Sequence, residues 1–243
     1  VEKQNTYVAY SNRYTCVEIK NPQTSLDFEV VFLNGYNGYS KFLDFIRSSN
    51  ELRLFYSNGK DTKYAYVSFK SITKTELQSN TIQSSLSLDK LSLWLNKINY
   101  QISVNEDVKG KTFPFGYPHI YSSSYNGEIY VKNNGEVKAP LNIIIAGAVN
   151  NPRVDILDGD TIISSLKIMV KSDDCIITVN SDESDQFITI TENGVTKNAY
   201  QMQDFSCDNF LFIDKGEKKI RFSPGVNAKT TCNIQLLEGY GGN

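Results

Sequence analysis

The chain has 243 residues, of which 40% are hydrophobic and 21% are charged, and its formal net charge is −2. This length allows one large or two small domains, and either arrangement can bury an adequate core without metal or disulfide help. The 25 basic residues are balanced by 27 acidic ones, so no positive field would concentrate nucleic acid or an anionic membrane. We therefore expect no nucleic-acid partner.

The four cysteines are widely separated and form no Cys-x-x-Cys pair: Cys16, Cys175, Cys207 and Cys232. They lie mostly within apolar alternation, which predicts buried thiols rather than a disulfide or metal framework. The sequence has no signal peptide and no apolar run of about 18 residues, so we expect no membrane insertion and folding in a cytoplasm. The first residue is Val1 rather than Met, which we interpret as a leading segment that was removed or is not included.

The first half of the chain combines strand-like runs with one helical segment. Period-two alternation predicts strands over residues 15–19, 26–33, 52–56 and 64–69. Turn-forming residues fill 34–38, and a helix follows over 39–47, where Phe42, Phe45 and Ile46 are spaced three and four apart. Ser40 is placed to cap its first turn.

Two further features complete this half. Residues 57–59 predict a hairpin turn, after which Ala65, Val67 and Phe69 form the inward set of the returning strand. The apolar run 82–95 changes parity at Asp89-Lys90, which indicates either a β-bulge or a turn. Residues 96–111 lose clear periodicity and are interpreted as the interdomain connection, so we expect domains at 1–108 and 109–243.

The stretch Phe113–Val154 reads FPFGYPHIYSSSYNGEIYVKNNGEVKAPLNIIIAGAVNNPRV. Prolines among aromatics mark a connector or sheet edge, residues 128–132 predict a strand, and Asn133-Asn134-Gly135 predicts a hairpin-type turn into the next strand. In that strand Leu141, Ile143, Ile145 and Val149 share one face. Short alternating runs then continue to the end of the chain, at 162–170, 175–179, 187–190, 210–213, 220–222 and 231–237. This spacing favours an antiparallel β-sandwich.

No constellation nominates a catalytic, cofactor-binding or metal-binding residue. His119 is the only histidine and has no cysteine or second histidine at ligand spacing. Two acidic groups lack the spacing of a calcium loop and are interpreted as solvated turns: Asp155, Asp158 and Asp160, and Asp182, Glu183 and Asp185. No nucleotide-binding or hydrolase motif is present, so we predict a protein without enzymatic activity and without a cofactor.

The aromatic residues suggest surfaces for partners. Trp94 with Tyr100 could stack on a sugar, although partial core burial of Trp94 is the simpler interpretation. The chain has 15 tyrosines, and two groups of them are candidates for a subunit contact or for ordinary half-buried sheet positions: Tyr7, Tyr10 and Tyr14, and Tyr36 and Tyr39.

Three blocks of the sequence resemble distal tail proteins (Dit) of siphophages that infect Gram-positive bacteria. YSKFLDFIRSSNELRLFYSNG at 39–59, with KYAYVSFKSITKTELQ and LSLDKLSLWL after it, is similar to their N-terminal domain. The Phe113–Val154 stretch resembles the start of their C-terminal domain. DNFLFIDKGEKKIRFS at 208–223 and the final Gly-Tyr-Gly-Gly resemble its end.

The resemblance implies a mainly β fold, with an N-terminal β-sandwich-like domain that has one short helix and a C-terminal galectin-like antiparallel β-sandwich. It also implies a homo-oligomer, usually a hexameric ring, that joins the tail tube protein to the tail-tip hub within the virion after assembly in the host cytoplasm. The C-terminal domain would be a platform for receptor-binding or other baseplate proteins. Family members generally have further residues ahead of the point where this chain begins.

Two alternatives remain open at this stage. The first is a carbohydrate-binding baseplate module that contacts host cell-wall saccharide through aromatic faces such as Tyr117, Tyr121 or Trp94. The second is a tail-associated hydrolase, for which distant strands would have to bring two carboxylates together.

Overall fold

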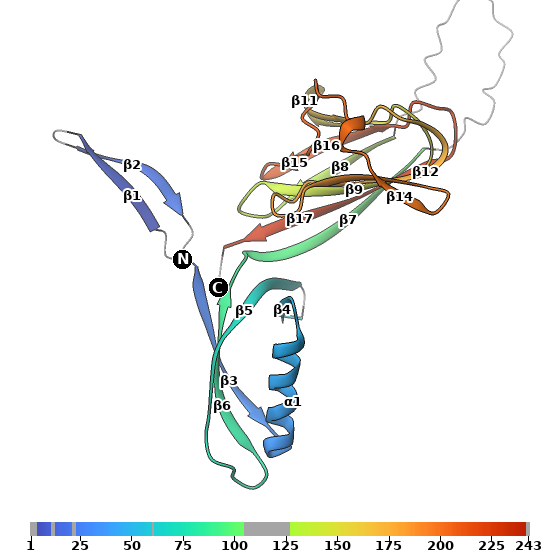
Figure 1. Cartoon of the computed structure of the whole chain (residues 1–243). Helices are drawn as coiled ribbons and strands as arrows, with labels where there is room; N and C mark the ends of the chain where they lie inside the picture. Colours follow the sequence, from blue (N-terminus) through green and yellow to red (C-terminus); the bar gives the residue numbers. More distant parts are fainter. Residues whose placement is uncertain (1–3, 11–12, 21–22, 60, 105–126, 242–243) are drawn as a thin grey trace, which may run out of the picture. The chain divides into compact units, whose positions relative to one another are not determined.

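The computed structural model describes residues 4–10, 13–20, 23–59, 61–104 and 127–241, which form two compact units (Figure 1). The N-terminal unit comprises Val1–Asn96 with Tyr240–Asn243, and the C-terminal unit comprises Lys97–Gly239. The described part is mainly β and contains a single α-helix, which confirms the predicted fold class. The predicted domain boundary between residues 108 and 109 lies outside the described residues and stays a prediction.

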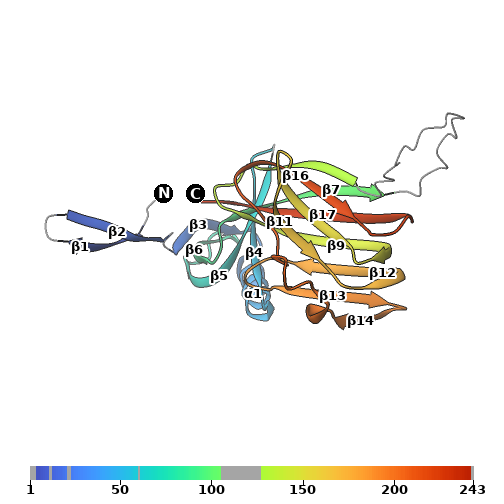
Figure 2. The ribbon, with the colours of Figure 1, turned by 90° about the horizontal axis from the view of Figure 1, so that it is seen from above.

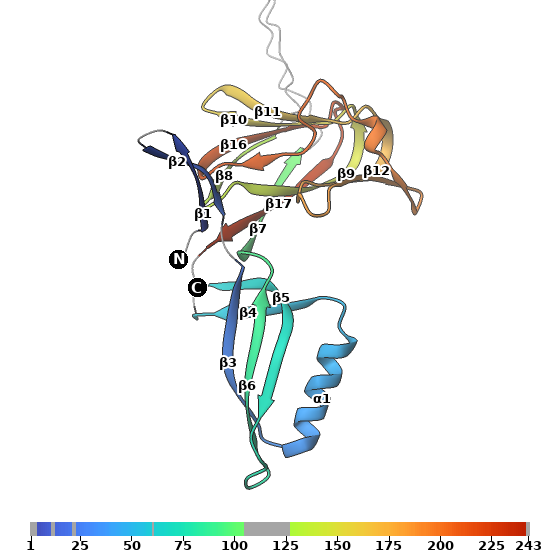
Figure 3. The same cartoon turned by 60° about the vertical axis from the view of Figure 1, so that its left-hand side comes forward.

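The N-terminal unit contains two sheets and the helix. Its elements are β1 (Gln4–Tyr10), β2 (Arg13–Lys20), β3 (Thr24–Phe32), α1 (Gly35–Ser48), β4 (Leu52–Ser57), β5 (Thr62–Lys74) and β6 (Ile82–Lys90). Strands β1 and β2 form an antiparallel sheet of their own. The other sheet has the order β3-β6-β5-β4 with antiparallel neighbours, and α1 lies beside it (Figure 3).

Helix α1 begins earlier than predicted. Residues 35–38 belong to its first turn instead of a loop, and Ser40 lies inside the helix, so the prediction that Ser40 is the cap was wrong. Gly35 explains the difference, because its φ is +52° and a Cβ there would lie 2.8 Å from Leu77 Cδ1. Close packing of Gly35 therefore fixes the start of the helix against the low helix propensity of its first residues. Phe42 then packs on Phe32, with 5.4 Å between the ring centroids.

The inward set of β5 is confirmed, because Ala65 and Val67 are buried and Phe69 packs against the small core of this unit. The parity change near Asp89-Lys90 is a break in the strand and not a reversal of the chain, because Lys90 pairs with Val67 of β5 and Leu95 pairs with Tyr64 of the same strand. The chain advances five residues here while β5 advances three, so the extra residues form a bulge-like irregularity. Strand β6 ends at Lys90 and β7 (Trp94–Val104) begins four residues later. Between them, the Leu91 amide donates to Tyr66 O at 2.8 Å and Ser92 Oγ accepts from the Tyr66 amide at 2.9 Å.

The interdomain connection predicted at residues 96–111 was wrong over 96–104, because β7 continues to Val104. Its inward residues include Ile102 and Val104, which are buried, whereas the outward Asn99 and Gln101 are polar and exposed. In the sequence, the polar residues on the outward face make this part of the strand resemble a loop. The rest of the predicted connection, 105–111, lies outside the described residues.

The C-terminal unit is a sandwich of two sheets. Besides β7, its elements are β8 (Gly127–Asn133), β9 (Ala139–Asn150), β10 (Arg153–Asp158), β11 (Thr161–Lys167), β12 (Lys171–Asn180), β13 (Phe187–Glu192), β14 (Val195–Asn198), the 3-10 turn η1 (Tyr200–Met202), β15 (Phe212–Ile213), β16 (Gly216–Ser223) and β17 (Thr230–Tyr240). One sheet has the order β11-β10-β16-β8, and the other has the order β14-β13-β12-β9-β17-β7 (Figure 2). Side chains of both sheets share one core.

The central strand of this core confirms the prediction for β9: Leu141, Ile143, Ile145 and Val149 are all at most 1% exposed. The predicted β8–β9 hairpin, however, was wrong. Strand β8 pairs with β16, while β9 pairs with β12 and β17, so residues 134–138 carry the chain from one sheet to the other.

The cysteine prediction holds for two of the four thiols. Cys175 and Cys232 are buried, and burial raises the pKa of Cys232 to about 12. Cys16 is exposed, which contradicts the prediction, because the β1–β2 hairpin exposes the side chains around it to solvent; Cys207 is half-buried. None of the four cysteines forms a disulfide with another described residue.

Lys90 provides a test of core electrostatics in the N-terminal unit. It is 9% exposed on the inward parity of β6, and burial lowers its pKa. The unfolded lysine binds its proton more tightly, so stability rises as pH increases between the lowered pKa and the ordinary value of about 10.4. We expect Lys90→Met to stabilise the unit by about 1 kcal/mol at neutral pH and to flatten this alkaline rise. Urea unfolding at several pH values measures both effects.

The control for Lys90 is Lys41→Met, an exposed lysine on α1, which should change neither the stability nor its pH dependence by more than about 0.5 kcal/mol. Loss of stability in Lys90→Met would show that its ammonium makes favourable contacts that outweigh the cost of burial.

Candidate assembly interface

The two units differ in how well they cover their apolar side chains. Among the described residues, the N-terminal unit buries seven hydrophobic residues and exposes thirteen large ones, whereas the C-terminal unit buries 26 and exposes eleven. Isolated exposed apolar residues are normal, but an excess of this kind marks a surface that meets a partner. The candidate interface therefore lies on the N-terminal unit.

The first component is one face of the β1–β2 hairpin. The register pairs Tyr7 with Cys16 and Ala9 with Tyr14, which places these four side chains on the same face. Tyr7 is 56% exposed and Tyr14 is 77% exposed. A two-stranded sheet is marginally stable by itself in water, so an apolar face of this kind gains stability when another surface covers it. Of the predicted contact tyrosines, the side chain of Tyr10 lies outside the described residues.

The second component is the edge strand β3. It pairs only with β6 among the described strands, so its other edge presents unpaired backbone N–H and C=O groups over nine residues. Phe28 and Val31 on this strand are exposed, and so is Leu33 just beyond it. An open edge with exposed apolar side chains is a template for pairing with another chain.

The third component is β4 at the opposite end of the same sheet, which has β5 as its one partner within the described part of the chain. Phe55 and Tyr56 on β4 are 64% and 56% exposed. Arg53 lies over the Tyr66 ring at 5.1 Å and donates to Glu51 at 2.8 Å, and this hydrogen bond raises the pKa of Arg53. Aromatic residues and arginine are enriched at the strongest contacts of protein interfaces.

The edges at β3 and β4 differ in sequence, so they are not self-complementary. Two unlike edges on one sheet favour head-to-tail association, in which each subunit presents one edge to the other edge of its neighbour. Rotation at each contact then closes a ring or builds an open helix. The sequence alone did not reveal these edges, because an edge depends on which distant strands pair.

Tyr36 and Tyr39 on α1 have different surroundings. Tyr39 packs edge-on against Phe32, with 5.5 Å between the ring centroids, so it contributes to packing within the subunit. Tyr36 is 50% exposed, and Lys74 Nζ lies 4.5 Å from its ring centroid. Only Tyr36 of this pair remains accessible to a neighbour.

The candidates for chemistry are dispersed. His119, Tyr117 and Tyr121 lie outside the described residues. Trp94 is half-buried beside Tyr56, at 6.0 Å between ring centroids. Tyr100 packs on the core of the C-terminal unit.

The acidic residues are engaged with neighbours. Asp155 is buried and accepts hydrogen bonds from Arg153 and Ser165, at 2.6 Å each. Four of the other acids form surface contacts: Asp158 with Lys218, Asp160 with Lys219, Glu183 with Lys138, and Asp182 with Ser184. Asp185 is held through its backbone, whose carbonyl accepts from Asn180 Nδ2 at 2.7 Å. Across the described residues, no group of three His, Cys, Asp or Glu side chains could hold a metal ion. In the same residues, no helix combines the length and apolarity needed to cross a bilayer.

Residues 1–91 match a family model described as "Distal tail protein, N-terminal domain". Among curated proteins there is no match to this chain.

Solved structures of phage tail-tip proteins share the fold. A chain from the phage P2 baseplate, in its activated conformation with Ca, is 17% identical, with a TM-score of 0.63 over 98% of this chain and 86% of that one. The Dit protein of phage SPP1, described as a paradigm of the hub adsorption apparatus in phages that infect Gram-positive bacteria, is 10% identical. Its TM-score is 0.65 over 97% of this chain and 87% of that one.

Proposed function

We propose that this chain, whose residues 1–91 match the N-terminal domain of distal tail proteins, is a distal tail protein that forms a hexameric ring joining the tail tube to the tail-tip hub of a phage. The N-terminal domain, predicted at 1–108, makes the ring. The C-terminal domain, predicted at 109–243, is a platform for receptor-binding or other baseplate proteins. The chain is a structural component of the virion, and we propose that it performs no catalysis.

The observation that carries this proposal is the excess of exposed apolar side chains on the N-terminal unit, which the matched family model spans almost completely. The unlike edges at β3 and β4 supply a head-to-tail contact, and the hairpin supplies a second surface that can reach a neighbour. A permanent interface of this type should bury more than about 2,000 Å². The number six rests on the likeness to distal tail proteins, because the edges alone set no copy number.

Native mass spectrometry of the purified chain tests the ring. We expect a dominant species of six times the 27.4 kDa chain mass, and electron micrographs of the same sample should contain annular particles. A strict monomer at high protein concentration, or an open filament without a closed species, would contradict the proposal.

A further inference from the structure

The outward face of the six-stranded sheet in the C-terminal unit has three adjacent rows of uncharged side chains that cross up to five of its strands. The charged residues Lys97 of β7 and Asp174 of β12 lie on the same face beyond these rows. The strand registers align one row of outward side chains: Asn233, Ile144, Thr178, Thr189 and Asn198. In the two neighbouring rows of the same face, two residues before and two residues after along each strand, the side chains are again Asn, Gln, Thr, Ala, Ile or Phe. This neutrality is unusual, because 21% of the chain is charged and an exposed sheet face is where charged side chains normally lie.

The other sheet of the same sandwich provides the contrast. On it, Arg221 donates to Glu128 at 2.6 Å, and Lys219 lies 3.6 Å from Glu128 and 3.4 Å from Asp160. These ion pairs are typical of a solvated sheet face. The absence of charge from these three rows is therefore a local property and does not follow from the composition of the unit.

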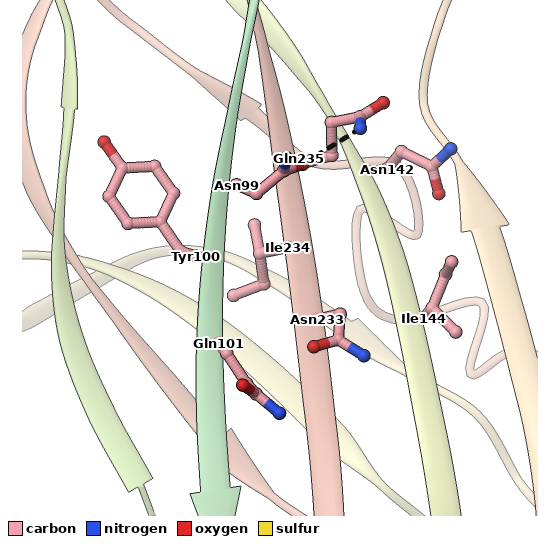
Figure 4. Close-up of a pocket in the computed structure, with 8 residues that line it drawn as sticks. All are labelled: Asn99, Tyr100, Gln101, Asn142, Ile144, Asn233, Ile234 and Gln235. Carbon is pink, nitrogen blue, oxygen red and sulfur yellow. Dashed lines mark hydrogen bonds between the residues drawn. The ribbon is translucent and has the colours of Figure 1, made fainter.

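The neutral face is hollowed into a groove of about 410 Å³ over β7, β17 and β9 (Figure 4). It is lined by Asn99, Tyr100 and Gln101 from β7, Asn233, Ile234 and Gln235 from β17, and Asn142 and Ile144 from β9. Tyr100 and Ile234 have the inward parity of their strands and belong to the core of the sandwich. A groove of this size lies within the range of small-molecule sites in proteins.

Most of these amides are available to a ligand. Gln235 Nε2 donates to Asn99 Oδ1 at 3.0 Å, which holds those two side chains together. The side chains of Gln101, Asn142 and Asn233 make no hydrogen bond with other described residues, and Asn142 Oδ1 is buried without a partner. Each amide combines a carbonyl acceptor with two N–H donors. The groove thus offers donors and acceptors side by side, with Ile144, 38% exposed, as an apolar floor.

We propose that this groove binds a neutral oligosaccharide. Sugar hydroxyls both donate and accept hydrogen bonds, and they match side-chain amides in both roles, while the C–H faces of the sugar ring match Ile144. An ionic ligand would lose its hydration without gaining a charged partner in the groove. A protein partner normally meets aromatic or arginine anchors, and the groove projects none outward. The proposal is independent of ring formation, which concerns the other unit.

Saturation-transfer NMR with the full chain tests this site. The probes are neutral homo-oligosaccharides of glucose, galactose, mannose, rhamnose and N-acetylglucosamine, with uronic acid and sulfated oligomers as charged comparators. We expect transfer to at least one neutral oligomer and none to the charged ones. Asn233→Asp and Gln101→Glu keep the side-chain shape but introduce charge and remove donors, so each should weaken binding at least about tenfold.

The matched control is Asn193→Asp, which adds the same charge in the exposed turn between β13 and β14 and should leave binding unchanged. Three results would overturn the proposal: no transfer to any neutral oligomer, equal binding by Asn233→Asp, or equal weakening by Asn193→Asp. If the groove variants instead abolished capture of a purified tail protein while no saccharide bound, the face would be a protein docking surface.

Discussion

Deleting residues 4–20 is expected to convert the proposed hexamer into monomers without destabilising what remains. The hairpin forms its own two-stranded sheet, so its removal breaks no strand pairing in either the β3-β6-β5-β4 sheet or the C-terminal sandwich. The exposed face that contains Tyr7 and Tyr14 would be lost with it. We expect the mass to fall about sixfold, to that of the shortened chain, and the thermal unfolding midpoint to shift by no more than about 2 °C.

Light scattering and thermal unfolding of the same samples separate assembly from stability. Tyr14→Ser tests the apolar face of the hairpin with a single change and should shift the hexamer toward monomers at low protein concentration. Thr15→Ala is the control, because Thr15 pairs with Val8 on the opposite face of the same hairpin. Hexamers that persist after deletion of residues 4–20 would place the ring contacts on the edges at β3 and β4 alone.

Alternation along a single strand could be predicted from the sequence wherever one face is consistently apolar. On β9 the inward residues Leu141, Ile143 and Ile145 are uniformly apolar, and the pattern could be recognised even though the outward Ile144 is an isoleucine that is 38% exposed. Strand β7 failed the same test because Asn99 and Gln101 on its outward face resemble a loop. The start of α1 also failed, since close packing of Gly35 against Leu77 is a tertiary contact.

Which strands pair with each other could not be predicted from the sequence, and the candidate interface depends on this strand pairing. Asn133-Asn134-Gly135 correctly indicates a change of direction, but β8 takes as its partner β16, which lies more than 80 residues further along the chain. Likewise, Tyr7 and Tyr14 have the same alternation whether their face is covered or exposed. The structure shows which apolar side chains are exposed, because among the described strands β1 pairs with β2 alone and β3 pairs with β6 alone.

The crossover between β8 and β9 yields the largest expected loss of stability, in the variant Asn133→Ala. Asn133 is 1% exposed, and its Nδ2 donates to Val137 O and Ile213 O at 2.9 Å each. Its Oδ1 accepts from the Gly135 amide at 2.8 Å. Alanine removes all three hydrogen bonds and leaves buried backbone groups without partners. We therefore expect the free energy of unfolding of the C-terminal unit to fall by about 3–4 kcal/mol.

Two further variants show whether the hydrogen bonds of Asn133 cause this loss. Asn133→Asp keeps the acceptor for Gly135 but replaces the donor with a buried carboxylate facing the Ile213 carbonyl, so it should destabilise at least as much as alanine. Asn233→Ala removes an exposed amide from the same unit and should cost less than about 0.5 kcal/mol in denaturant unfolding. A loss below about 1 kcal/mol in Asn133→Ala would mean that the crossover is held mainly by the neighbouring contact, in which Glu238 Oε1 accepts from the Asn134 amide at 2.7 Å. Strands β8 and β9 belong to different sheets, so a crossover held by Asn133 itself couples the stability of the two sheets. Loss of this crossover should therefore unfold both sheets in one transition.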